Sequence, residues 1–173
     1  NSYSTSTGGT VNFLRPVGQQ SQIELNVSAI TARYQRNPSL NGSQYSILSQ
    51  YERALSTRIF SRVALRFDRQ VARDNAYTNS TYGGELLLSA QVGRQTVYGR
   101  FGYYRTVAEE AFGFLGKRRN DLLLDAEAGV LLRRWQWLGM ASILRIGRTI
   151  NRSPVFFYDF RQWRVETGLS REF

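Results

Sequence analysis

The side chains that most often carry out chemistry in proteins are scarce in this sequence. It contains no histidine and no cysteine, so neither a Ser-His-Asp nor a Cys-His arrangement can form, and no thiolate can bind a metal. The carboxylates with the most suggestive spacing are Asp125 and Glu127. They could form a two-carboxylate catalytic site, or they could simply be part of the polar lining of a barrel lumen. We favour the second interpretation because acid–base catalysis near neutral pH usually employs histidine. We therefore expect no enzyme activity, no metal site and no cofactor.

The chain is strongly basic, and its positive charge comes almost entirely from arginine. The net charge is +10, and Lys117 is the only lysine. Arginine binds phosphates and carboxylates well, so the partner could be nucleic acid, anionic lipid or an acidic protein; biased base composition is the alternative explanation. The segment 100–105 mixes arginine with aromatic residues that could stack on nucleic acid. It equally suits an ordinary strand end, and without an RNA-binding fingerprint we expect no nucleic-acid partner.

Apolar and polar residues alternate with a period of two along much of the chain. Successive side chains on a strand point to opposite faces, so such a segment has one apolar and one largely polar face. A strand would place Asp125 and Glu127 side by side, whereas a helix would separate them. The segments that alternate are 23–29, 63–67, 86–92, 97–103 and 122–132.

The pattern predicts an all-β, antiparallel protein in one domain, 1–173, in which 1–9 is a loop or tail. The alternation is weakest in 44–55, and its faces cannot be assigned from the sequence. The expected strands are 10–16, 21–34, 44–55, 59–70, 81–92, 96–106, 119–132, 136–149 and 156–173.

The expected connections alternate between short and long. The short ones are 17–20, 56–58, 93–95 and 133–136, and the long polar ones are 35–44, 71–81, 106–120 and 150–155. Short turns at one end and long loops at the other are typical of an up-and-down transmembrane β-barrel. Glu109 and Glu110 lie in the longest loop and are expected to be solvated.

A soluble β-sandwich or a lipocalin-like barrel would show the same alternation with its leucines turned inward. Strand length favours the membrane, because several strands reach the ~9–11 residues that cross a bilayer when tilted, and aromatic residues cluster near strand ends. The polar faces carry charges of both signs, which suits a hydrated lumen. The charged residues expected to line the lumen and a client's path are Arg62, Arg66, Glu85, Arg100, Asp125, Glu127, Arg164 and Glu166.

The last expected strand has apolar or amphipathic residues at alternate positions and ends on an aromatic residue. It resembles the signal by which the barrel-assembly machinery selects outer-membrane proteins, although Arg171 departs from the usual apolar residue. The resemblance implies the bacterial outer membrane as the location and the assembly machinery as a partner. The residues of the signal are Trp163, Val165, Leu169 and Phe173.

Three motifs narrow the resemblance to one family. The segments 114–121, 152–161 and 168–173, with an alternating strand after the first, resemble the barrel end of surface lipoprotein assembly modifiers. The likeness is best over 106–173. It implies an outer-membrane translocation factor that helps lipoproteins or secreted proteins reach the cell surface, with that client, membrane lipid and lipopolysaccharide as partners. Members of this family carry a periplasmic helical-repeat domain before a larger barrel.

Two departures from that family shape the expectation. The helical-repeat domain is absent from these 173 residues, and an odd number of strands is unusual in bacterial single-chain barrels. We therefore expect part of a larger barrel, completed by an N-terminal fragment or another chain; alternatively, 10–16 is not a strand and eight strands remain. A passive porin or structural barrel is the main alternative function, and a soluble basic barrel that binds nucleic acid is a third.

Overall fold

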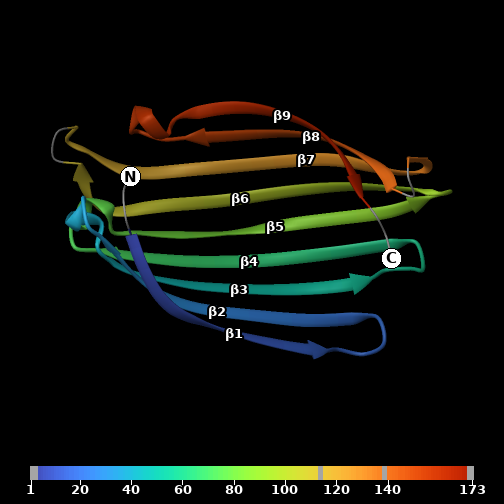
Figure 1. Cartoon of the computed structure of the whole chain (residues 1–173), viewed down its shortest axis with the longest axis horizontal. Helices are drawn as coiled ribbons and strands as arrows, with labels where there is room; N and C mark the ends of the chain where they lie inside the picture. Colours follow the sequence, from blue (N-terminus) through green and yellow to red (C-terminus); the bar gives the residue numbers. More distant parts are fainter. Residues whose placement is uncertain (1–3, 113–114, 138–139, 171–173) are drawn as a thin grey trace.

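The computed structural model describes residues 4–112, 115–137 and 140–170. They form one sheet of nine antiparallel strands, each paired with its neighbours in sequence order. Figure 1 shows the strands side by side in a curved sheet, with the first and last at its two edges. The strands are β1 (Ser4–Pro16), β2 (Ser21–Tyr34), β3 (Gly42–Ala54), β4 (Ile59–Ala72), β5 (Asn79–Val92), β6 (Gln95–Phe112), β7 (Lys117–Trp137), β8 (Met140–Arg152) and β9 (Phe160–Ser170).

The all-β, antiparallel up-and-down arrangement predicted from the alternation is confirmed. Every strand pairs with the next along the chain, as expected when short connections join strands of period two. Among the described residues, β1 and β9 each pair with one neighbour only and not with each other. Closure of the sheet into a barrel therefore stays a prediction.

The two ends of the sheet differ in their connections. Tight turns lie at one end, at the right of Figure 1, and include the two-residue turn 93–94, where Gly93 has a φ of 61°. Glycine adopts such a positive φ without steric cost. The opposite end, here called the loop end, carries longer connections that contain the short 3₁₀ helices η1 (Pro38–Leu40), η2 (Asn75–Tyr77) and η3 (Phe156–Tyr158).

Four sequence predictions about element boundaries are wrong. Residues 4–9, expected in a loop or tail, belong to β1 and pair with β2 across the full register. The expected turn 133–136 lies inside β7, where an irregularity between Leu132 and Gln136 absorbs the polar residues without ending the strand. Residues 156–158 form η3, and β9 begins only at Phe160.

The expected loop 106–120 is also wrong, because β6 and β7 extend through most of it. Pairing continues to Phe112 and Lys117 after a register shift between Val107 and Ala111. Contacts of Glu109 with other parts of the chain stabilise the extension of β6. The Glu109 backbone N–H donates to the Thr78 carbonyl, and the Glu109 carboxylate pairs with Arg69. This polar segment thus forms strand because a neighbouring loop binds its backbone and an arginine of β4 pairs with its side chain.

The sheet has little conventional core. A small cluster lies at the loop end, where Val155 and Ala76 are buried and Tyr77, Leu115 and Tyr158 pack around them. It joins the connections that carry η2 and η3. Within the described ranges, no helix is long and apolar enough to span a membrane.

Candidate functional site

The two faces of the sheet differ sharply in chemistry. On one face, here called the outer face, large apolar side chains are exposed; Leu65 and Val165, for example, are 63% and 67% exposed. On the other, the side chains of Asp125 and Glu127 are only 15% and 11% exposed. Polar side chains more covered than apolar ones indicate that the polar face is concave, so that its side chains crowd together. We call it the concave face.

Charged side chains form a continuous line of ion pairs across the concave face from β3 to β9. We call this line the charge belt. It begins where Glu52 of β3 lies 3.9 Å from Arg62 of β4, and Arg62 lies 3.4 Å from Glu85 of β5. Opposite charges on adjacent strands attract one another, and this alternation gives each belt arginine a carboxylate neighbour. The members of the belt are Glu52, Arg62, Glu85, Arg100, Asp125, Glu127, Arg145, Arg164 and Glu166.

Arg100 of β6 is the centre of the belt. Its guanidinium lies 3.2 Å from Glu85, 2.7 Å from Asp125 and 3.5 Å from Glu127. These carboxylates come from the strands on either side of β6, so one planar cation is shared by three carboxylates. Arginine suits this position because its guanidinium presents several donors in fixed directions.

The belt continues past Glu127 by crossing β8. Glu127 pairs in register with Gly147, which pairs with Arg164 of β9. The Arg164 Nη2 lies 3.0 Å from the Glu127 carboxylate, so the ion pair passes over Gly147. A Cβ on Gly147 would lie 3.4 Å from this nitrogen, which leaves little room for a larger side chain.

A second glycine, Gly129 of β7, makes room for a tyrosine of β6 that binds the belt. The ring of Tyr98 lies over Gly129, its register partner on β7, where a Cβ would come within 2.4 Å of the ring. The Tyr98 hydroxyl donates a hydrogen bond of 2.8 Å to Glu127. Gly129 therefore allows the tyrosine to lie flat and reach the carboxylate.

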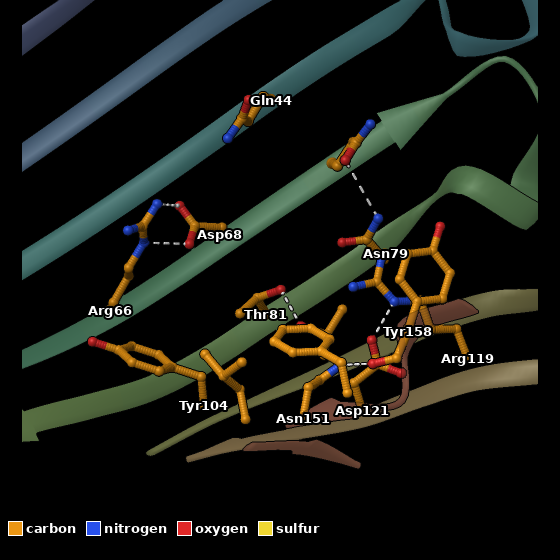
Figure 2. A pocket seen from close by; sticks show the side chains of 14 residues that line it. Gln44, Arg66, Asp68, Asn79, Thr81, Tyr104, Arg119, Asp121, Asn151 and Tyr158 are labelled. Carbon is orange, nitrogen blue, oxygen red and sulfur yellow. Dashed lines mark hydrogen bonds and ion pairs between the residues drawn. The ribbon is translucent and has the colours of Figure 1, made fainter. Parts of the chain in front are cut away.

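A hollow of about 490 Å³ lies on the concave face between the belt and the loop end. Figure 2 shows it surrounded by side chains from several strands and from η3, with amide, hydroxyl, aromatic and charged groups. Charges in the hollow are paired along single strands. Arg66 binds Asp68 through two nitrogens, at 2.5 and 3.3 Å, and Arg119 pairs with Asp121.

The concave face thus combines many polar groups with little uncompensated charge. Among the described residues no three carboxylates gather into a group suited to a metal ion. Asp125 and Glu127 are both engaged by Arg100, and Thr149 donates a 2.6 Å hydrogen bond to Asp125. The concave face is therefore a surface of paired charges and hydrogen-bonded polar groups.

Comparison with known sequences places the chain in a family. The profile of the surface lipoprotein assembly modifier family matches residues 1–173. The chain belongs to the surface lipoprotein assembly modifier family. Comparison with curated proteins and with solved structures gave no match.

The family resemblance inferred from three motifs is therefore confirmed, and it extends over the whole chain rather than chiefly over 106–173. Surface lipoprotein assembly modifiers are outer-membrane assembly factors and do not form a known enzyme family. Membership implies a role in the assembly of surface lipoproteins.

The structure of this assembly-modifier chain brings most of the predicted charged residues together. All of them except Arg66 belong to the charge belt, and Arg66 lies on the same face beside the hollow. Of the predicted assembly signal, Trp163, Val165 and Leu169 are exposed on the outer face, and Phe173 lies outside the described residues. That the charges line a client's path stays a prediction.

Two members of the belt were missed from the sequence. Glu52 lies in the segment whose faces the weak alternation left unassigned, yet a turn centred on Thr57 would have placed it opposite Arg62, as observed. Arg145 was hidden by the misplaced turn at 133–136, which shifts the register between β7 and β8. The hollow had no sequence signal, because its lining combines residues from distant strands.

Proposed function

We propose that this sheet is part of the wall of a transmembrane β-barrel in the bacterial outer membrane, and that its concave face guides a lipoprotein or secreted protein toward the cell surface. The observation that carries the proposal is the inverted polarity of the sheet. Apolar side chains such as Leu65 and Val165 are exposed on the outer face while ion pairs occupy the concave face, in a chain of the surface lipoprotein assembly modifier family.

Strand length and surface chemistry support a membrane location. The shortest described strand, β9, holds 11 residues and all the others hold 13 or more, whereas a tilted strand needs about 9–11 to cross a bilayer. Large apolar side chains are exposed on the outer face of every strand except β7, whose described part exposes Ala126 and Ala128 there. Exposing so wide an apolar face to water is unfavourable, whereas contact with lipid acyl chains is not.

A barrel also requires partners for the two edge strands. Backbone N–H and C=O groups cannot remain unpaired in the hydrocarbon region, so the free edges of β1 and β9 must pair with other strands. Those strands belong to this protein or to another chain. The barrel-assembly machinery would act at the β9 edge, where Trp163, Val165 and Leu169 face outward.

The concave face suits transient contact with a client. Because the belt arginines already have carboxylate partners, a passing chain meets polar groups without a strong net field of either sign. Such a wall would hydrate a client and hold it weakly, as release at the surface requires.

The test is site-specific crosslinking in living cells. A photo-reactive amino acid at Tyr104, which lines the hollow, should crosslink a lipoprotein client during export, whereas the same group at Tyr103 on the outer face should not. Deletion of the gene should leave that client inside the outer membrane. If the deletion changes small-solute permeability while every surface lipoprotein is still displayed, the protein is a passive porin. If the protein can be extracted without detergent, it is a soluble barrel.

A further inference from the structure

Three arginines that have no carboxylate partner among the described residues gather on the outer face at the loop end of β6 to β9. Arg105 of β6 and Arg152 of β8 lie on either side of Leu122 of β7, in register. Arg161 of β9 is one step nearer the middle of the sheet, opposite Ile150. Together with Tyr103, these side chains line a hollow of about 490 Å³. We call the three arginines the outer arginine cluster.

The outer arginine cluster differs from the charge belt in having no counter-charge of equal size. Within the described ranges, none of its three guanidinium groups forms an ion pair with a carboxylate; Arg105 Nε donates to Asn120 at 3.0 Å. The one carboxylate lining the hollow belongs to Asp159, which accepts a hydrogen bond from the Ser153 backbone N–H. The hollow therefore carries three positive charges against one negative charge.

An apolar surface adjoins the cluster toward the middle of the strands. Phe101, Ile146 and Val165 are 51%, 49% and 67% exposed on this face. The Arg148 guanidinium lies over the Trp163 ring, 5.0 Å from its centre, and this register pair lies between Arg161 and Val165 along β9. A ligand bound here would meet cations at one end and apolar side chains along its length.

We propose that the outer arginine cluster binds the phosphorylated headgroup of a lipid in the outer leaflet, the chemistry of the lipid A part of lipopolysaccharide. Arginine binds phosphate through paired N–H donors, and the acyl chains would lie along the apolar face. The inference rests on the proposed function, since the long loops mark the extracellular end only if the sheet spans the outer membrane. An acidic protein would not require the adjoining apolar face.

The test is lipid binding to the whole protein, purified in detergent and measured by native mass spectrometry. The probes are bisphosphorylated lipid A and the same lipid with both phosphates removed. The triple variant R105Q/R152Q/R161Q should bind bisphosphorylated lipid A about tenfold or more weakly than the wild type, because hydrogen bonds between charged groups are lost. The dephosphorylated lipid should bind the wild type and the variant about equally.

The matched control removes the same charge from the opposite end. Arg15, Arg53 and Arg58 are exposed near the tight turns, and R15Q/R53Q/R58Q should bind bisphosphorylated lipid A like the wild type. Equal binding of this lipid by both triple variants, or equal binding of the two lipids by the wild type, would overturn the proposal.

A second variant keeps the test independent of folding. Asp159→Asn removes the single negative charge of the hollow and should tighten binding of bisphosphorylated lipid A about threefold, since one like-charge repulsion disappears. Unchanged or weaker binding would count against the cluster as a phosphate site. Client display by each variant, measured in cells, reports separately on the proposed function, so a failure of one inference is distinguishable from a failure of the other.

Discussion

Glu127 and Arg164 form a 3.0 Å ion pair although a whole strand, β8, runs between their own strands. The pair is possible because Gly147, at the same level of β8, has no side chain to block it. This relationship links the charge belt across β7, β8 and β9 over a position where a Cβ would already contact the Arg164 guanidinium.

Replacement of Gly147 by valine should break that link. The Cβ alone would lie 3.4 Å from the Arg164 guanidinium, and the branched side chain would displace it, at a cost of about 1–3 kcal/mol. Thermal unfolding of the whole protein in detergent would measure the loss. Gly168→Val is the control, since a Cβ there meets nothing within 4 Å; equal melting temperatures for the two variants would refute the role of Gly147.

The contact between Tyr98 and Gly129 makes a second prediction. Gly129→Ala places a Cβ 2.4 Å from the Tyr98 ring, so the ring must move and its hydrogen bond to Glu127 is lost. We expect the free energy of unfolding to fall by about 1–3 kcal/mol, measured by urea titration of the protein folded in lipid vesicles. Gly99→Ala should be nearly silent, because its Cβ would meet nothing within 4 Å, and an equal loss there would argue against this packing.

Arg100 should matter more than any arginine that serves a single carboxylate. Arg100→Gln leaves Glu85, Asp125 and Glu127 near one another without their shared cation, which should cost about 2 kcal/mol. Arg66→Gln is the comparison, because Arg66 pairs with Asp68 alone and its side chain is 51% exposed. Chemical denaturation of both variants should show the larger loss for Arg100; equal losses would mean that the belt does not act as a network.

Two adjacent leucines on β5 test the assignment of the faces. Leu86 lies on the outer face between Val63 and Phe101, whereas Leu87 lies on the concave face between Arg62 and Arg100. Leu86→Glu places a charge in lipid, at a cost of about 1–3 kcal/mol, and should lower the yield of folded protein in the outer membrane. Leu87→Glu places the same charge between two arginines and should keep that yield, as seen by heat-modifiable migration in gels. The reverse order would show that the faces are assigned wrongly.

Much of this architecture was predictable because strand alternation is a local property. The period of two places Asp125 and Glu127 on one face, and the turn around Thr57 puts Glu52 opposite Arg62 without further information. Register across β7 and β8 was not predictable in the same way. The irregularity between Leu132 and Gln136 moves the turn past a polar segment, so the positions of Gly147 and Arg145 depend on pairing that the local pattern does not reveal.

Loops and hollows depend even more on contacts between distant segments. Glu109 was expected in a solvated loop, but its pairing with Arg69 and the hydrogen bond of its backbone to Thr78 keep it on β6. The outer arginine cluster likewise arises only when β6, β7, β8 and β9 pair in this order. Charge composition revealed an excess of arginine, and the fold shows that three of these arginines gather on one hollow of the outer face.

The central claim is that the outer face meets lipid while the concave face meets water. The chain has no cysteine, so single cysteines at positions 26 to 29 of β2 can be probed with a water-soluble maleimide in intact outer membranes. Asn26 and Ser28 lie on the concave face, and Val27 and Ala29 lie on the outer face. The account predicts labelling at 26 and 28 and protection at 27 and 29. Labelling at all four positions, or the opposite alternation, would contradict it.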